Sequence, residues 1–299
     1  MPKCRAFPAA ACVVAAWLIL TGCSSSGSQG GAIPAPGAER YGMPALDAGS
    51  TQPHIFVTMY NDDALTEFTL SGKPVRTITE GLHSPQGVTI DRNGKIYVAN
   101  LLSNTVTTYT YDGRPTTPTI RKGLDKPIGV AVDSSGKIYV TNEGNNTLTT
   151  YKPDGTRTTP TIATYINFPG IPAVDGKGKI YIPEYRSNAV TTYTPDGKPT
   201  TPTITYGLFE PIAVQIGADG KIWVTNFGIS DVASFTPAGK PTTPTIFGPF
   251  GPVGLAVTSN RVYVANRNGD DVATFTLKGG RSKPNITDLN DGLTGIAVH

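Results

Sequence analysis

Residues 123–164 read GLDKPIGVAVDSSGKIYVTNEGNNTLTTYKPDGTRTTPTIAT, and this stretch decides the fold. It contains four short segments with the composition of strands, namely Gly129–Val132, Lys137–Asn142, Thr147–Tyr151 and Thr158–Ile162. Turn sequences that contain glycine separate the second strand from the first and the fourth from the third, and no segment has the 3.6-residue apolar period of a helix. The stretch therefore predicts a small sheet of four strands.

The same pattern recurs along the chain with a period of 42 residues. Three series keep this step: Gly94, Gly136, Gly178 and Gly220; Gly113, Gly155, Gly197 and Gly239; and Pro118, Pro160, Pro202 and Pro244. A period near 40 residues without helices is typical of the blades of a β-propeller. The prolines place the fourth strand at the outer edge of each blade, because proline cannot donate a hydrogen bond to a neighbouring strand.

The repeats can be counted from their first residues. Full units begin near Gly81, Gly123, Tyr165, Gly207 and Gly248. Residues 289–299 supply only the first strand of another unit, and its missing strands lie near the N-terminus, where His54–Thr58 matches Lys95–Ala99. We therefore predict an all-β, six-bladed β-propeller of four-stranded blades in residues 53–299, closed by strands from both termini.

Residues 1–22 have the pattern of an export signal. Lys3 and Arg5 precede an apolar run that is too short to span a bilayer, and the run ends in Leu-Thr-Gly-Cys. This ending resembles the lipobox of bacterial lipoproteins, which implies a lipid on Cys23; the alternative is an ordinary signal peptide with a chance cysteine. Residues 23–52, rich in Gly, Ser and Pro, predict a flexible tether.

The signal predicts where the protein is located. We expect an exported, lipid-anchored protein, in the outer membrane of a Gram-negative cell or otherwise on the outer leaflet of the cytoplasmic membrane. The formal net charge of +3 includes Lys3 and Arg5, which leave with the signal, so no basic field would recruit nucleic acid. Cys4 and Cys12 leave with it too, and the exported domain would have no disulfide. We expect a monomer.

Four copies of one motif carry a family resemblance. They are KIYVAN (95–100), KIYVTN (137–142), KIWVTN (221–226) and RVYVAN (261–266). These motifs resemble the NHL repeat and its relatives, which include the YVTN-type repeats of surface proteins and the streptogramin-lyase propellers. The resemblance covers residues 53–299 and implies the architecture, but such propellers include enzymes, protein binders and sugar binders alike.

The resemblance also frames the expected function. Streptogramin lyases use paired histidines and glutamates with magnesium, and no such pair can be placed among the three histidines here. Low charge, many threonines and aromatic loop residues favour a binding or scaffolding module for a protein or glycan partner rather than an enzyme. The alternative is a metal-assisted lyase or lactonase of the streptogramin-lyase or gluconolactonase type.

Asparagines end the second strand in four blades, and two interpretations of them are open. Under one, they form a ring of ligands for a divalent cation, as in gluconolactonase-like propellers. Under the other, each side chain caps the backbone of its own following loop, which is the usual role of a residue that recurs in every blade. We favour caps and expect no resident cofactor. The four residues are Asn100, Asn142, Asn226 and Asn266.

Residues that break the repeat are better candidates for a site. The third blade has Pro-Glu-Tyr-Arg where other blades have the asparagine, and Phe-Pro-Gly-Ile-Pro before its first strand. A carboxylate, a phenol, a guanidinium and aromatic rings at the channel mouth can bind a sugar or a peptide, although a solvated salt bridge would also explain them. No catalytic or metal-binding residue is predicted. The predicted ligand-binding residues are Phe168, Glu184, Tyr185, Arg186, Phe209 and Glu210.

Overall fold

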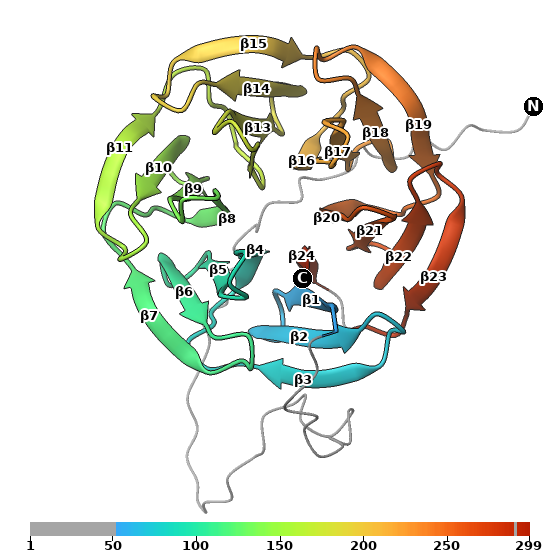
Figure 1. The fold of residues 1–299 in the computed structure, drawn as a ribbon, viewed down its shortest axis with the longest axis horizontal. Coiled ribbons are helices and arrows are strands. Elements are labelled where there is room, and N and C mark those ends of the chain that lie inside the picture. Colours follow the sequence, from blue (N-terminus) through green and yellow to red (C-terminus); the bar gives the residue numbers. More distant parts are fainter. Residues whose placement is uncertain (1–51, 290–291) are drawn as a thin grey trace, which may run out of the picture. The chain divides into compact units, whose positions relative to one another are not determined.

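A computed structural model describes residues 52–289 and 292–299, which form a six-bladed β-propeller (Figure 1). Each blade is a sheet of four antiparallel strands, so the predicted fold class, blade number and strand number are confirmed. The predicted signal, Cys23 and nearly all of the tether lie outside the described residues. Within the described ranges, no helix is long and apolar enough to cross a membrane.

The strands follow the repeat, from the innermost to the outermost strand of each blade. Blade 1 contains β4 (Pro85–Ile90), β5 (Ile96–Asn100), β6 (Thr105–Tyr109) and β7 (Pro115–Ile120). Blade 2 contains β8 (Pro127–Val132), β9 (Ile138–Asn142), β10 (Thr147–Tyr151) and β11 (Arg157–Ile162). Blade 3 contains β12 (Ala173–Val174), β13 (Ile180–Glu184), β14 (Ala189–Tyr193) and β15 (Pro199–Ile204).

The remaining blades complete the ring (Figure 1). Blade 4 contains β16 (Pro211–Ile216), β17 (Ile222–Asn226), β18 (Asp231–Phe235) and β19 (Pro241–Phe247). Blade 5 contains β20 (Pro252–Val257), β21 (Arg261–Asn266), β22 (Asp271–Thr276) and β23 (Arg281–Ile286). Blade 6 contains β24 (Leu293–Val298), β1 (His54–Met59), β2 (Ala64–Thr69) and β3 (Pro74–Ile78).

Both termini build blade 6, as the sequence predicts. Strand β24 pairs antiparallel with β1, with Ile55 opposite Val298 and Val57 opposite Ile296. The backbones of His54 and His299 extend the pairing, with the His54 N–H donating to the His299 carbonyl oxygen over 2.8 Å. The C-terminal strand is therefore the innermost strand of the closing blade, and the ring has no open edge there.

The hydrophobic core lies between neighbouring blades. Each of six clusters of buried side chains joins two adjacent blades; for example, Tyr97 and Val106 of blade 1 pack with Val130 and Ile138 of blade 2. The second strand of each blade is buried along its whole length or nearly so, which explains its continuous apolar sequence.

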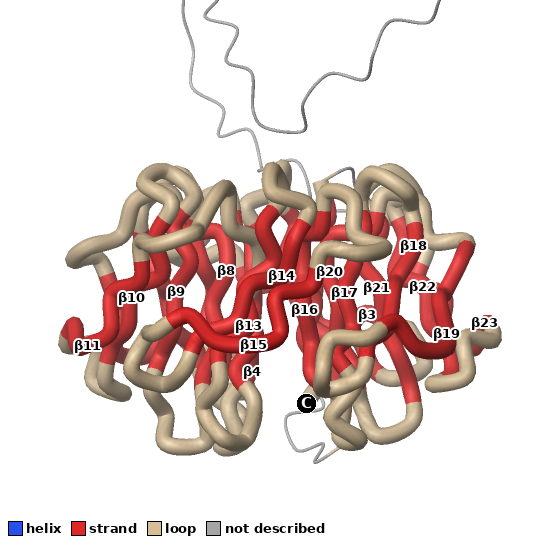
Figure 2. Tube along the Cα trace, turned by 90° about the horizontal axis from the view of Figure 1, so that it is seen from above, coloured by secondary structure: helices blue, strands red, loops and turns tan. Residues whose placement is uncertain are grey.

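Two kinds of loop lie on one side of the ring. One kind, here called the crossover loops, runs from the outermost strand of a blade to the innermost strand of the next; the other joins the second and third strands of a blade. Hydrogen bonds connect the two kinds between neighbouring blades, and the loops form a face separate from the strands (Figure 2). We call this side the crossover face.

Candidate functional site

The crossover loops are fixed by caps from the preceding blade. The Asn146 side-chain oxygen accepts a hydrogen bond from the Phe168 N–H over 2.7 Å, and the Asn188 oxygen accepts one from the Glu210 N–H over 2.8 Å. Both asparagines have left-handed backbone conformations, which asparagine tolerates better than most residues. The predicted site residues Phe168 and Glu210 are therefore held at defined positions on the crossover face.

Three of the four asparagines that end the second strands are structural caps. Asn142 is fully buried; its side-chain oxygen accepts from the Asp125 N–H over 3.1 Å, and its amide donates to the hydroxyls of Thr147 and Thr149. Asn100 makes the same set of contacts in blade 1. The capping role is therefore confirmed for Asn100, Asn142 and Asn226, but the loop that they hold is the crossover loop that precedes their blade, not the loop that follows each asparagine. Asn266 differs: its amide donates to Asp271, and its buried oxygen has no hydrogen-bond partner among the described residues.

Glu184 occupies the capping position in blade 3. Its carboxylate accepts hydrogen bonds from the Thr191 hydroxyl over 2.5 Å, from the Ser187 hydroxyl and from the Asn167 backbone N–H. Burial raises the pKa of the Glu184 carboxyl above its ordinary value, and the three hydrogen bonds partly oppose that change. The side chain is only 1% exposed. It holds the crossover loop in place, and direct contact with a ligand stays a prediction.

Three of the predicted residues form one contact cluster on blade 3. The Phe168 and Tyr185 rings have centroids 5.8 Å apart, and the Arg186 guanidinium carbon lies 4.7 Å from the Phe168 ring centroid. The Tyr185 N–H donates to the Phe168 carbonyl oxygen over 3.0 Å. Arg186 is exposed, whereas both rings are half-buried. The cluster therefore presents a cation and two aromatic edges to solvent.

Glu143 of blade 2 belongs to the same neighbourhood, although it was not among the predicted residues. Burial raises the pKa of the Glu143 carboxyl, while the nearby charges of Lys126 and Arg186 lower it. Glu143 directly follows the capping asparagine of its blade, at the position that Tyr185 occupies in blade 3. The residue type at this position changes from blade to blade, and this variation could have identified Glu143 from the sequence.

Phe209 and Glu210 lie in the next crossover loop. A side-chain carbon added to Gly228 would come within 2.3 Å of the Phe209 ring and 2.9 Å of the Glu210 carboxylate, so both side chains lie across this glycine. The Phe209 N–H donates to the Asn226 side-chain oxygen over 3.3 Å. Phe209 is 47% exposed. The structure thus places this pair on the crossover face in blade 4, next to the blade that carries the Phe168 cluster.

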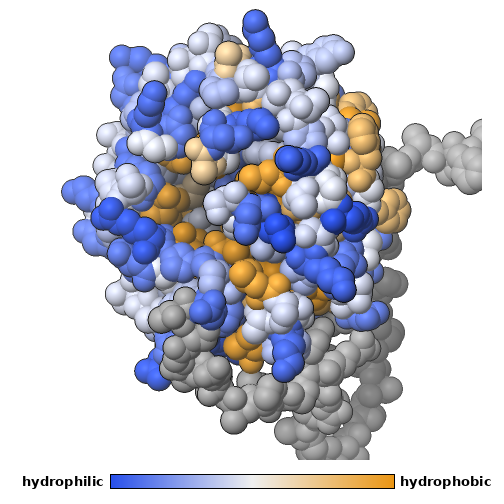
Figure 3. Space-filling view, turned by 45° about the vertical axis from the view of Figure 1, so that its right-hand side comes forward, coloured by the Kyte–Doolittle hydropathy of each residue, from blue (hydrophilic) through white to orange (hydrophobic). Residues whose placement is uncertain are grey.

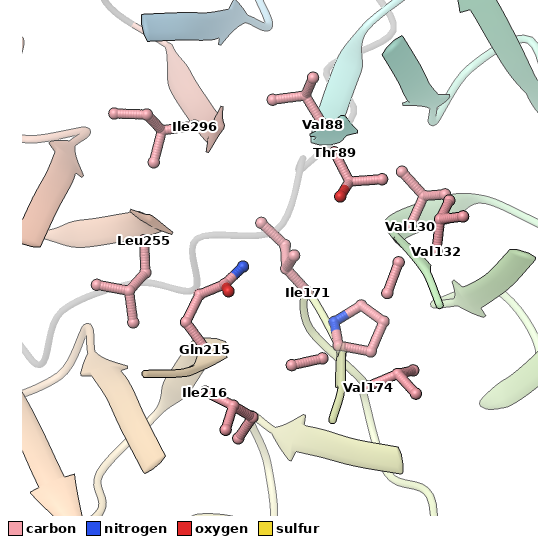
Figure 4. A pocket seen from close by; sticks show the side chains of 13 residues that line it. Val88, Thr89, Val130, Val132, Ile171, Val174, Gln215, Ile216, Leu255 and Ile296 are labelled. Carbon is pink, nitrogen blue, oxygen red and sulfur yellow. The ribbon is translucent and has the colours of Figure 1, made fainter. Parts of the chain in front are cut away.

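The central channel is narrow, and aliphatic side chains line it together with the polar residues Thr89 and Gln215. A cavity of about 100 Å³ is lined by the innermost strands of all six blades, and the Ile171 side chain points into it (Figure 4). The Ile171 backbone also pairs with blade 4, because its N–H donates to the Ile212 carbonyl oxygen over 2.8 Å. Pockets for small-molecule ligands are usually several times larger. A ligand would therefore lie over the mouth rather than inside the channel.

The comparisons with known proteins agree with the geometry. Residues 35–283 match the Virginiamycin B lyase family. This protein belongs to that family. No curated protein matches the chain. As in the sequence-based resemblance, membership in the virginiamycin B lyase family establishes the kind of propeller and leaves the ligand open.

Solved structures share the fold at low sequence identity. A chain of a nidogen–laminin complex is 18% identical with a TM-score of 0.70, covering 82% of this chain and 98% of that one. A streptogramin B lyase is 14% identical with a TM-score of 0.64, covering 82% and 83%. A virginiamycin B lyase from Staphylococcus aureus is 16% identical with a TM-score of 0.60, covering 77% and 83%. These likenesses support the architecture alone.

The magnesium ion that the lyase resemblance implies does not fit the residues present. In residues 52–289 and 292–299, no three His, Cys, Asp or Glu side chains lie close enough together to hold a metal ion. His83 reaches the crossover face but pairs with Asp63, 3.2 Å away, and His54 is buried in blade 6 against Glu67. No catalytic step through a metal ion is therefore derived from this site.

Proposed function

We propose that this protein is a lipid-anchored extracytoplasmic binding module that holds a protein or glycan partner on its crossover face. The observation that carries the proposal is the cluster of Phe168, Tyr185 and Arg186, with the exposed Phe209 in the adjoining crossover loop. Aromatic faces beside a guanidinium and a carboxylate bind partners in which apolar and polar groups alternate.

The fixed backbone of these loops supports a binding role. Caps from the preceding blade hold the Phe168 and Glu210 backbones, and Glu184 holds the Asn167 N–H. A partner that binds such a surface does not have to order the loops first, so less of the interaction energy is lost on binding. The small channel beneath leaves the outer surface as the place for contact.

Family membership favours one second candidate, a lyase or lactonase reaction at the channel mouth. One relative of known structure is a streptogramin B lyase, and a related structure was solved with quinupristin. Incubation of the purified protein with quinupristin and Mg²⁺, followed by liquid chromatography, tests this candidate. We expect no conversion above a heat-inactivated control; conversion that Glu143→Gln abolishes would establish the enzyme instead.

The binding role is tested by co-sedimentation of the purified protein with isolated cell-wall sacculi and with envelope membranes. We expect binding to at least one fraction, weakened about tenfold in Arg186→Ala because a cationic contact worth about 1.4 kcal/mol is lost. Leu102→Ala is the matched control, since Leu102 occupies the position of Arg186 in blade 1 and is also exposed. Equal binding by both variants and the wild type would contradict the proposed face.

The anchor makes a separate prediction. If Cys23 carries the lipid, Cys23→Ala gives soluble protein or an unprocessed precursor in place of a membrane-bound mature form. Membrane fractionation and the intact mass of the purified protein measure this change. Unchanged fractionation together with an unchanged mass would exclude lipidation at Cys23, without bearing on the crossover face.

A further inference from the structure

Three successive crossovers each carry two aromatic residues three positions apart, in the loop itself or, for Phe247, at the end of the preceding strand β19. The crossovers into blades 4 and 5 have aromatic residues at two equivalent positions. At these positions the crossover into blade 1 has Glu80 and His83, and the crossover into blade 2 has Lys122 and Asp125. The crossovers into blades 3, 4 and 5 are thus aromatic, whereas those into blades 1 and 2 are charged. The aromatic residues, together called the aromatic arc, are Tyr165 and Phe168, Tyr206 and Phe209, and Phe247 and Phe250.

The aromatic arc is unusually exposed. Eight large hydrophobic side chains are exposed among the described residues, and five of them belong to the arc. Exposure reaches 79% at Tyr206, 75% at Phe247 and 60% at Phe250. On the side that Figure 3 shows, most of the described surface is hydrophilic, and hydrophobic residues lie around a central hollow and in groups at the margin. Grouped exposed apolar side chains mark an interaction site.

We infer that the aromatic arc binds an extended, neutral polysaccharide, with sugar rings stacked on aromatic side chains of successive blades. This inference rests on the proposed function and names its partner. A pyranose ring has apolar C–H faces and hydroxyl edges, so it pairs with an aromatic face that has hydrogen-bonding neighbours. Such neighbours are present: Asn167 and Thr205 are exposed, and Glu210 is half-buried.

The charge of the loops favours a neutral ligand. Residues 163–169, 205–211 and 247–252, which contain the arc, include a single charged residue, Glu210. Residues 79–85 and 121–127, the crossovers of the other half, include five. Apart from Arg186, which lies over the Phe168 ring at one end of the arc, these crossovers offer an anionic polymer or an acidic membrane surface no cation of their own.

The arrangement of the aromatic residues favours a linear polymer over a protein. Protein interfaces surround a few central anchors with a compact patch that includes aliphatic side chains. Here the exposed aromatic residues are spread as one pair per crossover over three blades, with Ile229 the one exposed aliphatic residue among them in the described loops. Repeated aromatic platforms of this kind suit a polymer whose units repeat, as in proteins that stack successive bases of a single strand.

The arc also lies opposite the point where the chain continues toward the predicted anchor. Strand β1 begins at His54, beside the C-terminal His299, and ends at Met59, next to the loop that contains Asp63 on the crossover face. The described chain therefore begins, at Gln52, on the face opposite the arc.

Affinity electrophoresis of the full chain tests the inference. Native gels contain one neutral polysaccharide each (a β-glucan, a xylan, a galactomannan or starch), with alginate as the anionic comparison. We expect retardation by at least one neutral polymer and a higher affinity for its hexasaccharide than for its trisaccharide by calorimetry. Removal of two platforms in Phe209→Ala/Phe250→Ala should weaken binding about tenfold, since each stack is worth about 0.5–1.5 kcal/mol.

The control is the pair Leu70→Ala/Leu102→Ala, which removes two exposed apolar residues outside the arc. Far-UV circular dichroism and an unchanged melting temperature show that each variant is folded.

Absence of retardation by every neutral polymer, or equal binding by both double variants, would overturn the inference. If no polymer binds while sacculi or membranes still bind in an Arg186-dependent way, the inference fails and the proposed function stands. Binding of phosphatidylcholine vesicles that Phe209→Ala/Phe250→Ala abolishes would also overturn it.

Discussion

The closing blade and the continuous blades use different chemistry at the same position of the third strand. In blade 1 the Thr108 hydroxyl donates to the carbonyl oxygens of Thr116 and Pro118, over 3.0 and 2.9 Å, and blades 2–4 have a threonine or serine there with similar bonds. Blade 6 has Glu67 instead, which is fully buried and contacts His54 and Arg76 through its two carboxylate oxygens.

The difference extends to the contact with the next blade. A side-chain carbon on Gly155 of blade 2 would come within 2.6 Å of Pro118 in blade 1, and other turns repeat this close packing. At the boundary between blades 6 and 1, Gly113 faces Arg76 and Ile78 instead. Arg76 also donates to the Asp112 carbonyl oxygen in the same turn. The boundary that follows the closing blade is therefore held by charge as well as by packing.

The ring needs specificity where its two ends meet. Strands of blades 1–5 are joined by short loops, whereas β24 and β1 are the two ends of the domain and must find each other. A buried ionic group contributes little net stability, but it strongly disfavours arrangements that leave one charge without its partner. We expect the His54–Glu67–Arg76 group to favour the correct pairing of the closing blade over alternatives.

Removal of residues 293–299, which form the innermost strand of the closing blade, should cause the largest loss of stability. Leu293 and Ile296 are buried, and burial of each such side chain contributes roughly 1.5–3 kcal/mol. The deletion also removes the bond of Thr294 to the Thr58 hydroxyl and exposes the edge of β1. We expect loss of the cooperative thermal transition, measured by circular dichroism. A truncated protein that melts at the wild-type temperature would contradict closure by the termini.

Substitutions at this position of the third strand compare the buried ion pair of Glu67 in blade 6 with the hydroxyl hydrogen bonds of Thr108 in blade 1. Glu67→Ala leaves Arg76 without its buried partner and should lower the free energy of unfolding by about 3–5 kcal/mol. Thr108→Ala, at the equivalent position of blade 1, removes only hydroxyl hydrogen bonds and should cost about 1 kcal/mol. Urea denaturation of both variants measures the difference. Equal losses would show that blade 6 is held like the others.

Much of the fold could be predicted because the repeat aligns every strand, including the two that close the ring. The pairing of Ile55 with Val298 follows from that alignment. The His54–Glu67–Arg76 group could not be predicted, since each residue breaks the repeat separately and the three meet only in three dimensions.

The candidate site was predicted in part. The sequence grouped Phe168 with Tyr185 and Arg186 because their loops share a face, and the structure brings the three into contact. It did not predict that Glu184 is buried. A change from asparagine to glutamate looks like the loss of a cap, yet the longer side chain reaches the Asn167 N–H and the Thr191 hydroxyl from the same position.

The smallest change in stability is predicted for Glu184. This residue is a hydrogen-bonded acid at the position where other blades have a neutral asparagine cap. Burial raises the pKa of Glu184 above its ordinary value of 4.5, so the folded state holds the proton more tightly than the unfolded state. Below pH 4.5 both states are protonated and the difference vanishes. As the pH rises through the folded pKa, the buried carboxyl must ionise and stability falls relative to a neutral side chain.

Glu184→Gln should therefore raise the free energy of unfolding at pH 7 and leave it unchanged at pH 4. Asn142→Asp is the matched reverse change, since it places a carboxylate at the equivalent buried position of blade 2 and should destabilise the protein at pH 7. Urea denaturation at both pH values measures the two variants. If Glu184→Gln is instead less stable at pH 7, the charge of Glu184 is held by its three donors more strongly than burial opposes it, and the carboxylate is the better cap for the loop that carries Phe168.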